Sequence, residues 1–108
     1  MTASGSLSRT YLVERYAPGI ERAEVESEAG RVLAASAELC EEGRRVEYVG
    51  AMLVPGDEVV FHVFASECES TVREASVRAS VDYERVVESI AVGRLQLRRK
   101  QAEPQPEL

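Results

Sequence analysis

Six segments that alternate between strand and helix periodicity constrain the fold of this chain more than any other feature. The strand segments are rich in β-branched and aromatic residues, and the helical segments place apolar residues at steps of three and four. The pattern predicts, in chain order, a strand over 10–17, a helix over 20–42, strands over 45–54 and 59–65, a helix between Ser66 and Ala79, and a strand over 84–92.

Turn and capping residues separate these segments. The Pro-Gly pair at 18–19 ends the first strand, and Gly43 is suited to the C-cap of the first helix. The sequence PGDE at 55–58 predicts a tight turn, so the second and third strands should form a hairpin. Ser66 can cap the second helix, and Glu69 three residues later suits a capping box.

The order β-α-β-β-α-β predicts a ferredoxin-like α+β fold. Right-handed crossovers then give one antiparallel sheet in the order 4-1-3-2, with both helices on one face. The other face stays open, and we expect it to carry a patch of apolar residues, namely Leu12, Val60, Phe64, Val86 and Ile90. Monomers rarely expose such a patch, so we expect a homodimer that covers it.

Size and charge limit the possible classes of protein. The 108 residues fit one small domain over 10–93, with flexible segments at 1–9 and 94–108. A net charge of −6 argues against nucleic-acid binding. Neither an apolar run of 18 residues nor a secretory h-region occurs, which predicts a cytoplasmic protein without a membrane span.

The single histidine, His62, lies in the apolar run of the third predicted strand. Strand alternation places it with Glu14 and Glu88 on the open face, near the middle of three adjacent strands. Two carboxylates and an imidazole could bind a divalent metal, act as acid and base on a small ligand, or form an ion pair within a dimer interface. The residues alone leave all three interpretations open.

The two cysteines allow more than one interpretation as well. Cys40 and Cys68 fall at neighbouring ends of the two predicted helices, so a disulfide or a two-thiolate metal site is geometrically possible. A helix N-terminus would lower the pKa of Cys68, whereas its position on an apolar stripe favours a buried thiol. No P-loop, GxGxxG or GxSxG motif indicates an enzyme.

Four stretches carry a resemblance to a known family: YLVERYAPG (11–19), EEGRRVEYVGAMLVPGDEVVFHVFAS (41–66), TVREA (71–75) and YERVVESIAV (83–92). Across about 10–92 the chain resembles a small bacterial family of unknown function that includes a nickel-responsive, nickel-binding protein. The resemblance implies a dimeric ferredoxin-like fold and nickel binding. The family often has cysteine at the positions of Val60 and His62, so thiolate ligands from that strand are missing here.

Together these observations predict a cytoplasmic homodimer that binds a divalent transition metal, nickel, in sequestration or sensing. His62 is the predicted central ligand, with Glu14 and Glu88 as further ligands. The alternatives are an enzyme with a small-molecule pocket on the open face and a purely structural dimerisation module.

Overall fold

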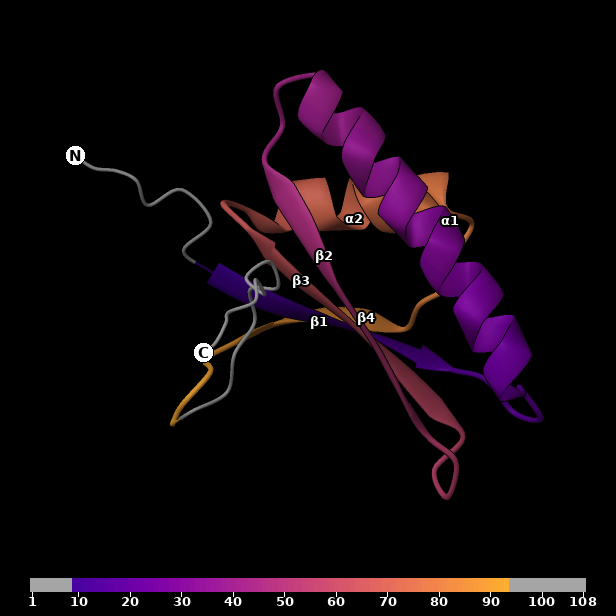
Figure 1. The fold of residues 1–108 in the computed structure, drawn as a ribbon. Helices are drawn as coiled ribbons and strands as arrows, with labels where there is room; N and C mark the ends of the chain where they lie inside the picture. The colour runs from indigo at the N-terminus through magenta and orange to yellow at the C-terminus, as the bar shows by residue number, and fades with distance from the viewer. Residues whose placement is uncertain (1–8, 94–108) are drawn as a thin grey trace, which may run out of the picture.

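A computed structural model describes residues 9–93 as one antiparallel sheet with two helices (Figure 1). The predicted flexible segments 1–9 and 94–108 lie outside the described residues, except for Arg9, which begins the first strand. The elements are β1 (Arg9–Tyr16), α1 (Arg22–Glu41), β2 (Val46–Val54), β3 (Val59–Ser66), α2 (Glu69–Arg78) and β4 (Arg85–Ser89).

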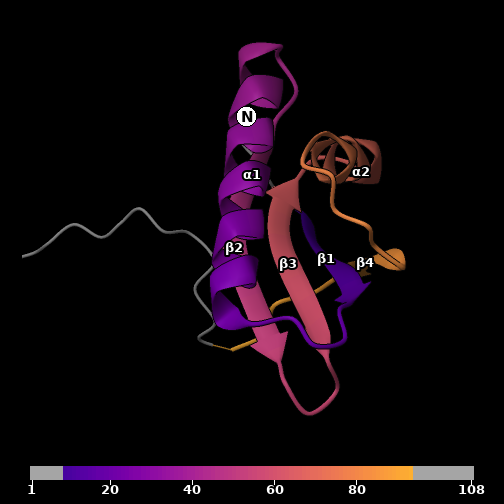
Figure 2. The same ribbon diagram turned by 90° about the vertical axis from the view of Figure 1, so that its right-hand side faces the viewer.

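The strands are ordered β2-β3-β1-β4, which is the predicted order read from the opposite edge. All three neighbouring pairs are antiparallel, and both helices pack on one face of the sheet (Figure 2). The predicted ferredoxin-like α+β fold is therefore confirmed. No helix within residues 9–93 is long and apolar enough to cross a membrane.

Local signals define both ends of α1. The backbone N–H of Glu21 donates to the Glu24 carboxylate at 2.9 Å, so this N–H at the start of the helix has a hydrogen-bond partner. At the other end Gly43 has a φ of 89°, and the N–H groups of Gly43 and Arg44 donate to the carbonyls of Cys40 and Leu39. This is a Schellman motif, so the prediction that Gly43 ends the helix is confirmed.

The second helix begins slightly later than the sequence predicts. Cys68 occupies the N-cap position, and the Ser66 hydroxyl accepts a hydrogen bond from the backbone N–H of Cys68 at 3.4 Å. The Ser66 hydroxyl itself donates to the carbonyl of Arg45 at 2.7 Å. Ser66 therefore ties the end of β3 to the residue before β2, in addition to supporting the helix start.

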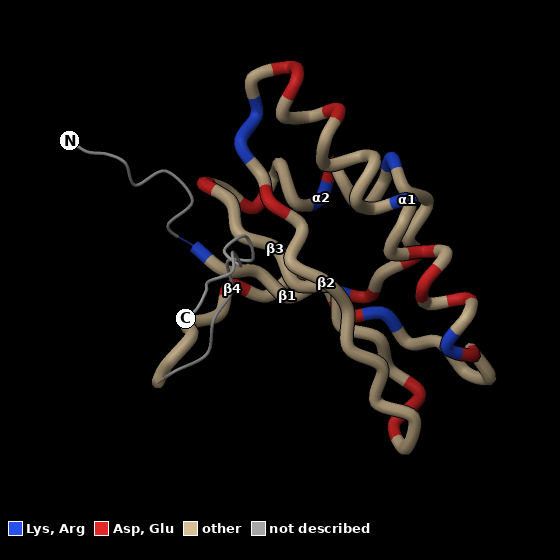
Figure 3. The backbone as a smooth tube through the Cα atoms, viewed as in Figure 1, with Lys and Arg blue, Asp and Glu red and all other residues tan. Residues whose placement is uncertain are grey.

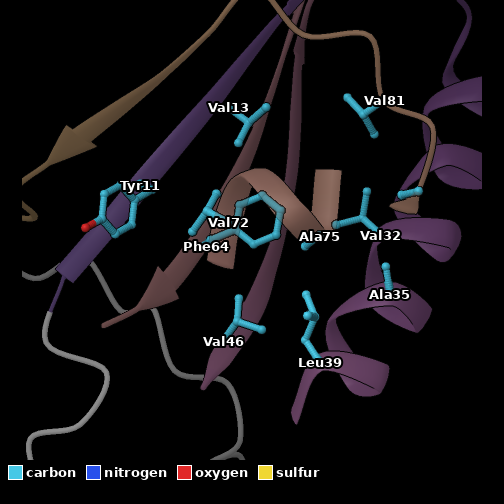
Figure 4. Close-up of a cluster of buried hydrophobic side chains, with 11 residues drawn as sticks. Tyr11, Val13, Val32, Ala35, Leu39, Val46, Phe64, Val72, Ala75 and Val81 are labelled. Atoms are coloured by element: carbon cyan, nitrogen blue, oxygen red, sulfur yellow. The ribbon is translucent and has the colours of Figure 1, made fainter. Parts of the chain in front are cut away.

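The main core lies between the sheet and the two helices, and Figure 4 shows its side chains converging from both layers. Its largest buried side chains are Tyr11 and Phe64 from the sheet and Leu39 from α1. Of the apolar stripe predicted for α2, Val72, Ala75 and Ala79 are buried, whereas Cys68 is exposed. The full cluster consists of Tyr11, Val13, Val32, Ala35, Leu39, Val46, Phe64, Val72, Ala75, Ala79 and Val81.

The predicted orientation of β3 is wrong. Val60, His62 and Phe64 point toward the helices and are all 0% exposed, whereas the sequence analysis placed them on the open face. The register agrees, because His62 lies opposite the buried Val13 of β1. The strand is apolar on both faces, so its alternation alone does not decide which set is covered.

The orientation predicted for β4 is also reversed. Val86 pairs with Val13 and packs against the core, so it faces the helices. Leu12 lies on the open face as predicted, where it pairs with Val63 and Val87. Ile90 follows the end of β4 and is exposed.

A β-bulge in β2 adds one residue to the strand between Tyr48 and Gly50. Tyr48 pairs with Phe64, and Ala51 pairs with His62, so both residues face the helices although they are three positions apart. In a regular strand residues three apart would point to opposite faces. The bulge therefore allows Tyr48 to lie beside His62.

We expect Phe64→Ala to lower the free energy of unfolding by about 3–5 kcal/mol, because it removes a buried ring and leaves a cavity. Leu33→Ala is the control, since Leu33 lies on α1 with 58% of its surface exposed; its effect should stay within about 0.5 kcal/mol. Urea denaturation of both variants measures the difference. Equal losses would contradict the assigned core.

Candidate functional site

The imidazole of His62 belongs to a buried chain of polar side chains between the sheet and α1. Arg15 Nε donates to Glu28 Oε2 at 2.7 Å, and Glu28 Oε1 faces His62 Nε2 at 3.5 Å. On the other side of the ring, Nδ1 lies 2.7 Å from the Tyr48 hydroxyl. Glu28 is 2% exposed and His62 is fully buried, so solvent does not screen the contact between the carboxylate and the imidazole.

One arrangement of protons gives Tyr48 and His62 a hydrogen bond, while His62 Nε2 and Glu28 Oε1 face each other without forming one. Burial raises the pKa of Tyr48, so its hydroxyl keeps its proton and can donate to His62 Nδ1. A proton on His62 Nε2 then faces the Glu28 carboxylate. Burial alone would raise the pKa of Glu28, but the interactions with His62 and Arg15 outweigh it, so the pKa is lower than usual.

These contacts favour a structural role for the buried chain. Both ring nitrogens of His62 face protein groups, and the ring has no solvent-exposed surface. A general acid or base must come within hydrogen-bond reach of its substrate, and an imidazole enclosed in this way does not. The Glu28 carboxylate instead connects α1 to β1 through its ion pair with Arg15 and to β3 through His62. Both the partner and the location differ from the predicted ion pair of His62 in a dimer interface.

The structure does not bring the three predicted ligands together. Glu14 lies on the open face, where its carboxylate accepts a hydrogen bond from Arg85 at 2.5 Å. Glu88 is exposed and pairs with Arg9 at 3.9 Å. Because His62 points beneath the helices, the predicted convergence of His62, Glu14 and Glu88 on the open face is wrong.

This arrangement does not fit a shared nickel ion. A metal site needs several donor atoms around one point, and each predicted carboxylate is paired with an arginine. The new neighbour of His62, Glu28, is also held by a guanidinium. Among residues 9–93, no group of three or more His, Cys, Asp or Glu side chains could hold a metal ion.

Both cysteines are exposed free thiols, so the predicted burial of Cys68 is wrong. Hydrogen bonds with the Ser70 and Thr71 hydroxyls lower the pKa of the Cys68 thiol to about 7. Cys40 Sγ lies 3.1 Å from the carbonyl oxygen of Val46. No disulfide joins Cys40 and Cys68.

The open face of the sheet carries an apolar hollow of about 460 Å³. Leu12 of β1, Val63 of β3 and Met52 of β2 contribute to its wall, and Ile90 lines it from the segment after β4. Met52 has 55% of its surface exposed. The volume falls in the range of small-molecule sites in proteins, which is about 300–1,000 Å³.

Comparisons with family models, curated proteins and solved structures find no match to this chain.

Sequence reasoning missed Glu28, although the chain contains a signal for it. The buried positions of α1 include Val25, Glu28, Val32 and Leu39, which follow helical spacing. A carboxylate on such a stripe requires a buried partner, and His62 was the one histidine available for that role.

We expect Glu28→Ala to lower the free energy of unfolding by about 3–5 kcal/mol at pH 7, because it leaves Arg15 without its buried partner. Glu38→Ala is the matched control on the same helix, where an exposed pair with Arg78 contributes less than about 1 kcal/mol. Urea denaturation measures both values. A loss no larger than that of Glu38→Ala would contradict the structural role.

The same pair gives a pH dependence with a defined sign. The pKa of Glu28 in the folded chain lies below its ordinary value of 4.5, so its contribution is fully present above that pH. The contribution is lost as the pH falls through the folded-state pKa. The difference in unfolding free energy between wild type and Glu28→Ala should therefore shrink on acidification below about pH 4.

Nickel binding stays a prediction that rests on the resemblance, and titration calorimetry of the untagged chain with Ni²⁺ tests it. Because the predicted ligands lie apart, we expect Glu14→Gln and Glu88→Gln to give the same heats as wild type. Saturable nickel binding that either substitution abolishes would restore the predicted ligand set.

Proposed function

We propose that this chain is a homodimeric binding module whose two open sheet faces meet and enclose a small apolar ligand. The observation that carries the proposal is the apolar hollow on the open face, lined by Leu12, Met52, Val63 and Ile90. Left in water, such a patch is unfavourable, because burial of apolar area contributes roughly 25 cal/mol per Å². A second copy of the chain covers it without requiring another partner.

The distribution of charge supports a second copy on this face. Each chain carries a net charge of −6, so two copies repel each other at most orientations. Figure 3 shows that the charged positions are concentrated on the helices and connecting loops, while the strands are mostly uncharged. Contact through the open face therefore brings few like charges together.

The charged residues at strand positions on this face are also compatible with a symmetric contact. Glu14 and Arg85 neutralise each other within one chain. Glu47 is the other charged residue in strand register there, and it pairs with Ala65 along the sheet. In an isologous dimer both copies contribute the same surface to the interface. Each copy therefore brings only a small net charge into the contact.

The lining of the hollow indicates the class of ligand. Its walls are mainly aliphatic, with Thr10 and Ser89 supplying hydroxyl groups. A compact apolar molecule with one or two polar groups fits such a surface. No catalytic group is required in this role, which is binding or carriage. Nickel sequestration or sensing remains a prediction that rests on the family resemblance. The side chains predicted to bind the metal lie apart, so we do not build the proposal on them.

We expect wild type to sediment at twice the chain mass of 11.9 kDa and Met52→Lys to raise the dimer dissociation constant by at least about thirtyfold. The substitution places a charge on the hollow in both copies. Val77→Lys is the matched control, because Val77 is 61% exposed on α2, on the opposite side of the sheet. Sedimentation velocity over a concentration series measures both constants.

Nile red fluorescence then tests the ligand. Wild type and Val77→Lys should bind the dye, and Met52→Lys should lose binding together with dimerisation. A wild-type chain that stays monomeric at all concentrations would contradict the proposal, as would equal dissociation constants for the two lysine variants.

A further inference from the structure

A second cavity, of about 400 Å³, lies on the helix side of the molecule, where β1 leads into α1. Its wall combines Arg15 at the end of β1, the loop over 17–20, and side chains along the start of α1. Glu24, Ser27 and Arg31 line it from that helix, and their spacing places them on one helical face. The cavity is therefore polar, in contrast to the hollow on the open face.

Two guanidinium groups in this wall are already held in position. Arg15 Nε is bonded to the buried Glu28 carboxylate at 2.7 Å, and its Nη1 lies 3.4 Å from the carbonyl of Tyr16. Arg31 Nε donates to the carbonyl of Ala79, at the end of α2, at 2.9 Å. Because both side chains are anchored through Nε, little conformational entropy remains to be lost when their terminal nitrogens bind a ligand.

Donors remain available on both arginines. Within residues 9–93, Arg15 Nη2 and both terminal nitrogens of Arg31 have no hydrogen-bond partner. Arg31 also has no ion-pair partner in that part of the chain, whereas Arg15 is paired with Glu28. A guanidinium carries five donors in a planar fork, which matches the two oxygens of a carboxylate.

The acidic side chains of the wall are partly engaged. Glu28 is held by Arg15 and His62, and Glu24 accepts a hydrogen bond from the backbone of Glu21. Their charges still oppose a dianion such as phosphate more strongly than a monoanion. The wall carries two arginines and two glutamates, so its formal charge is zero. A monoanion bound to Arg31 therefore leaves a smaller excess of negative charge than a dianion does.

We propose that this cavity binds a small organic monocarboxylate, with its carboxylate on Arg31 and Arg15 and its apolar body against the loop before α1. Ala17, Pro18 and Ile20 supply the apolar part of the wall, and Ser27 adds a hydroxyl group. The site is separate from the hollow on the open face, so it does not depend on dimerisation or on the ligand proposed there.

Benzoate serves as the probe in an amide NMR titration of the full chain. We expect saturable shifts at Gly19, Ile20 and Ser27, and no saturable shifts with benzamide, which has a similar shape without the charge. Arg31→Gln should weaken benzoate binding by about tenfold or more, since bonds to charged groups are lost. Arg22→Gln removes the same charge from an exposed position on the same helix and should change affinity less than about twofold.

Several results would overturn the assignment. These are an absence of saturable shifts with benzoate, equal binding of benzamide, or equal weakening by Arg31→Gln and Arg22→Gln. Tighter binding of inorganic phosphate at the same amides would overturn the choice of a monoanion. Arg31→Lys keeps the charge without the fork, and its amide spectrum shows whether the chain stays folded; it should weaken benzoate binding less than Arg31→Gln does.

Discussion

The buried ion pair between Arg15 and Glu28 is the interaction on which the position of α1 depends. A carboxylate in the layer between helix and sheet is tolerated only with partners, and Glu28 has Arg15 on one oxygen and His62 opposite the other. Apolar packing is non-directional and would accept small rotations of α1. The contacts of Glu28 do not, because Arg15 and His62 come from fixed positions on β1 and β3.

The two sides of the sheet differ in chemistry as a result. The helix side buries the ion pair and holds a polar cavity next to it, lined by Arg15 and Arg31. The open side has an apolar hollow with one neutralised pair, Glu14 with Arg85. A polar ligand and an apolar contact surface can therefore coexist on one small domain, since the sheet separates them.

The order and type of all six elements followed from the sequence, because the helices are long and periodic and glycine and proline mark the turns. The faces of β3 did not follow, since Val60 and Val63 make both of its sides apolar. All side chains of a strand change faces together when its orientation is reversed. The reversed orientation of β3 therefore placed His62 on the open face in the prediction, away from Glu28. Burial of Glu28 was the missing constraint.

The extra residue in β2 has a consequence for how this chain tolerates changes in length. The bulge between Tyr48 and Gly50 sets which side chains of the distal half of the strand point inward. Removing one residue at the bulge would leave Tyr48 and Ala51 two positions apart, so regular alternation would still turn both toward the helices and keep Met52 on the open face. Removing one residue from a regular part of the strand would instead disturb the alternation. Among related sequences, one-residue gaps should therefore fall at the bulge or in the hairpin loop and be excluded from the regular parts of β2.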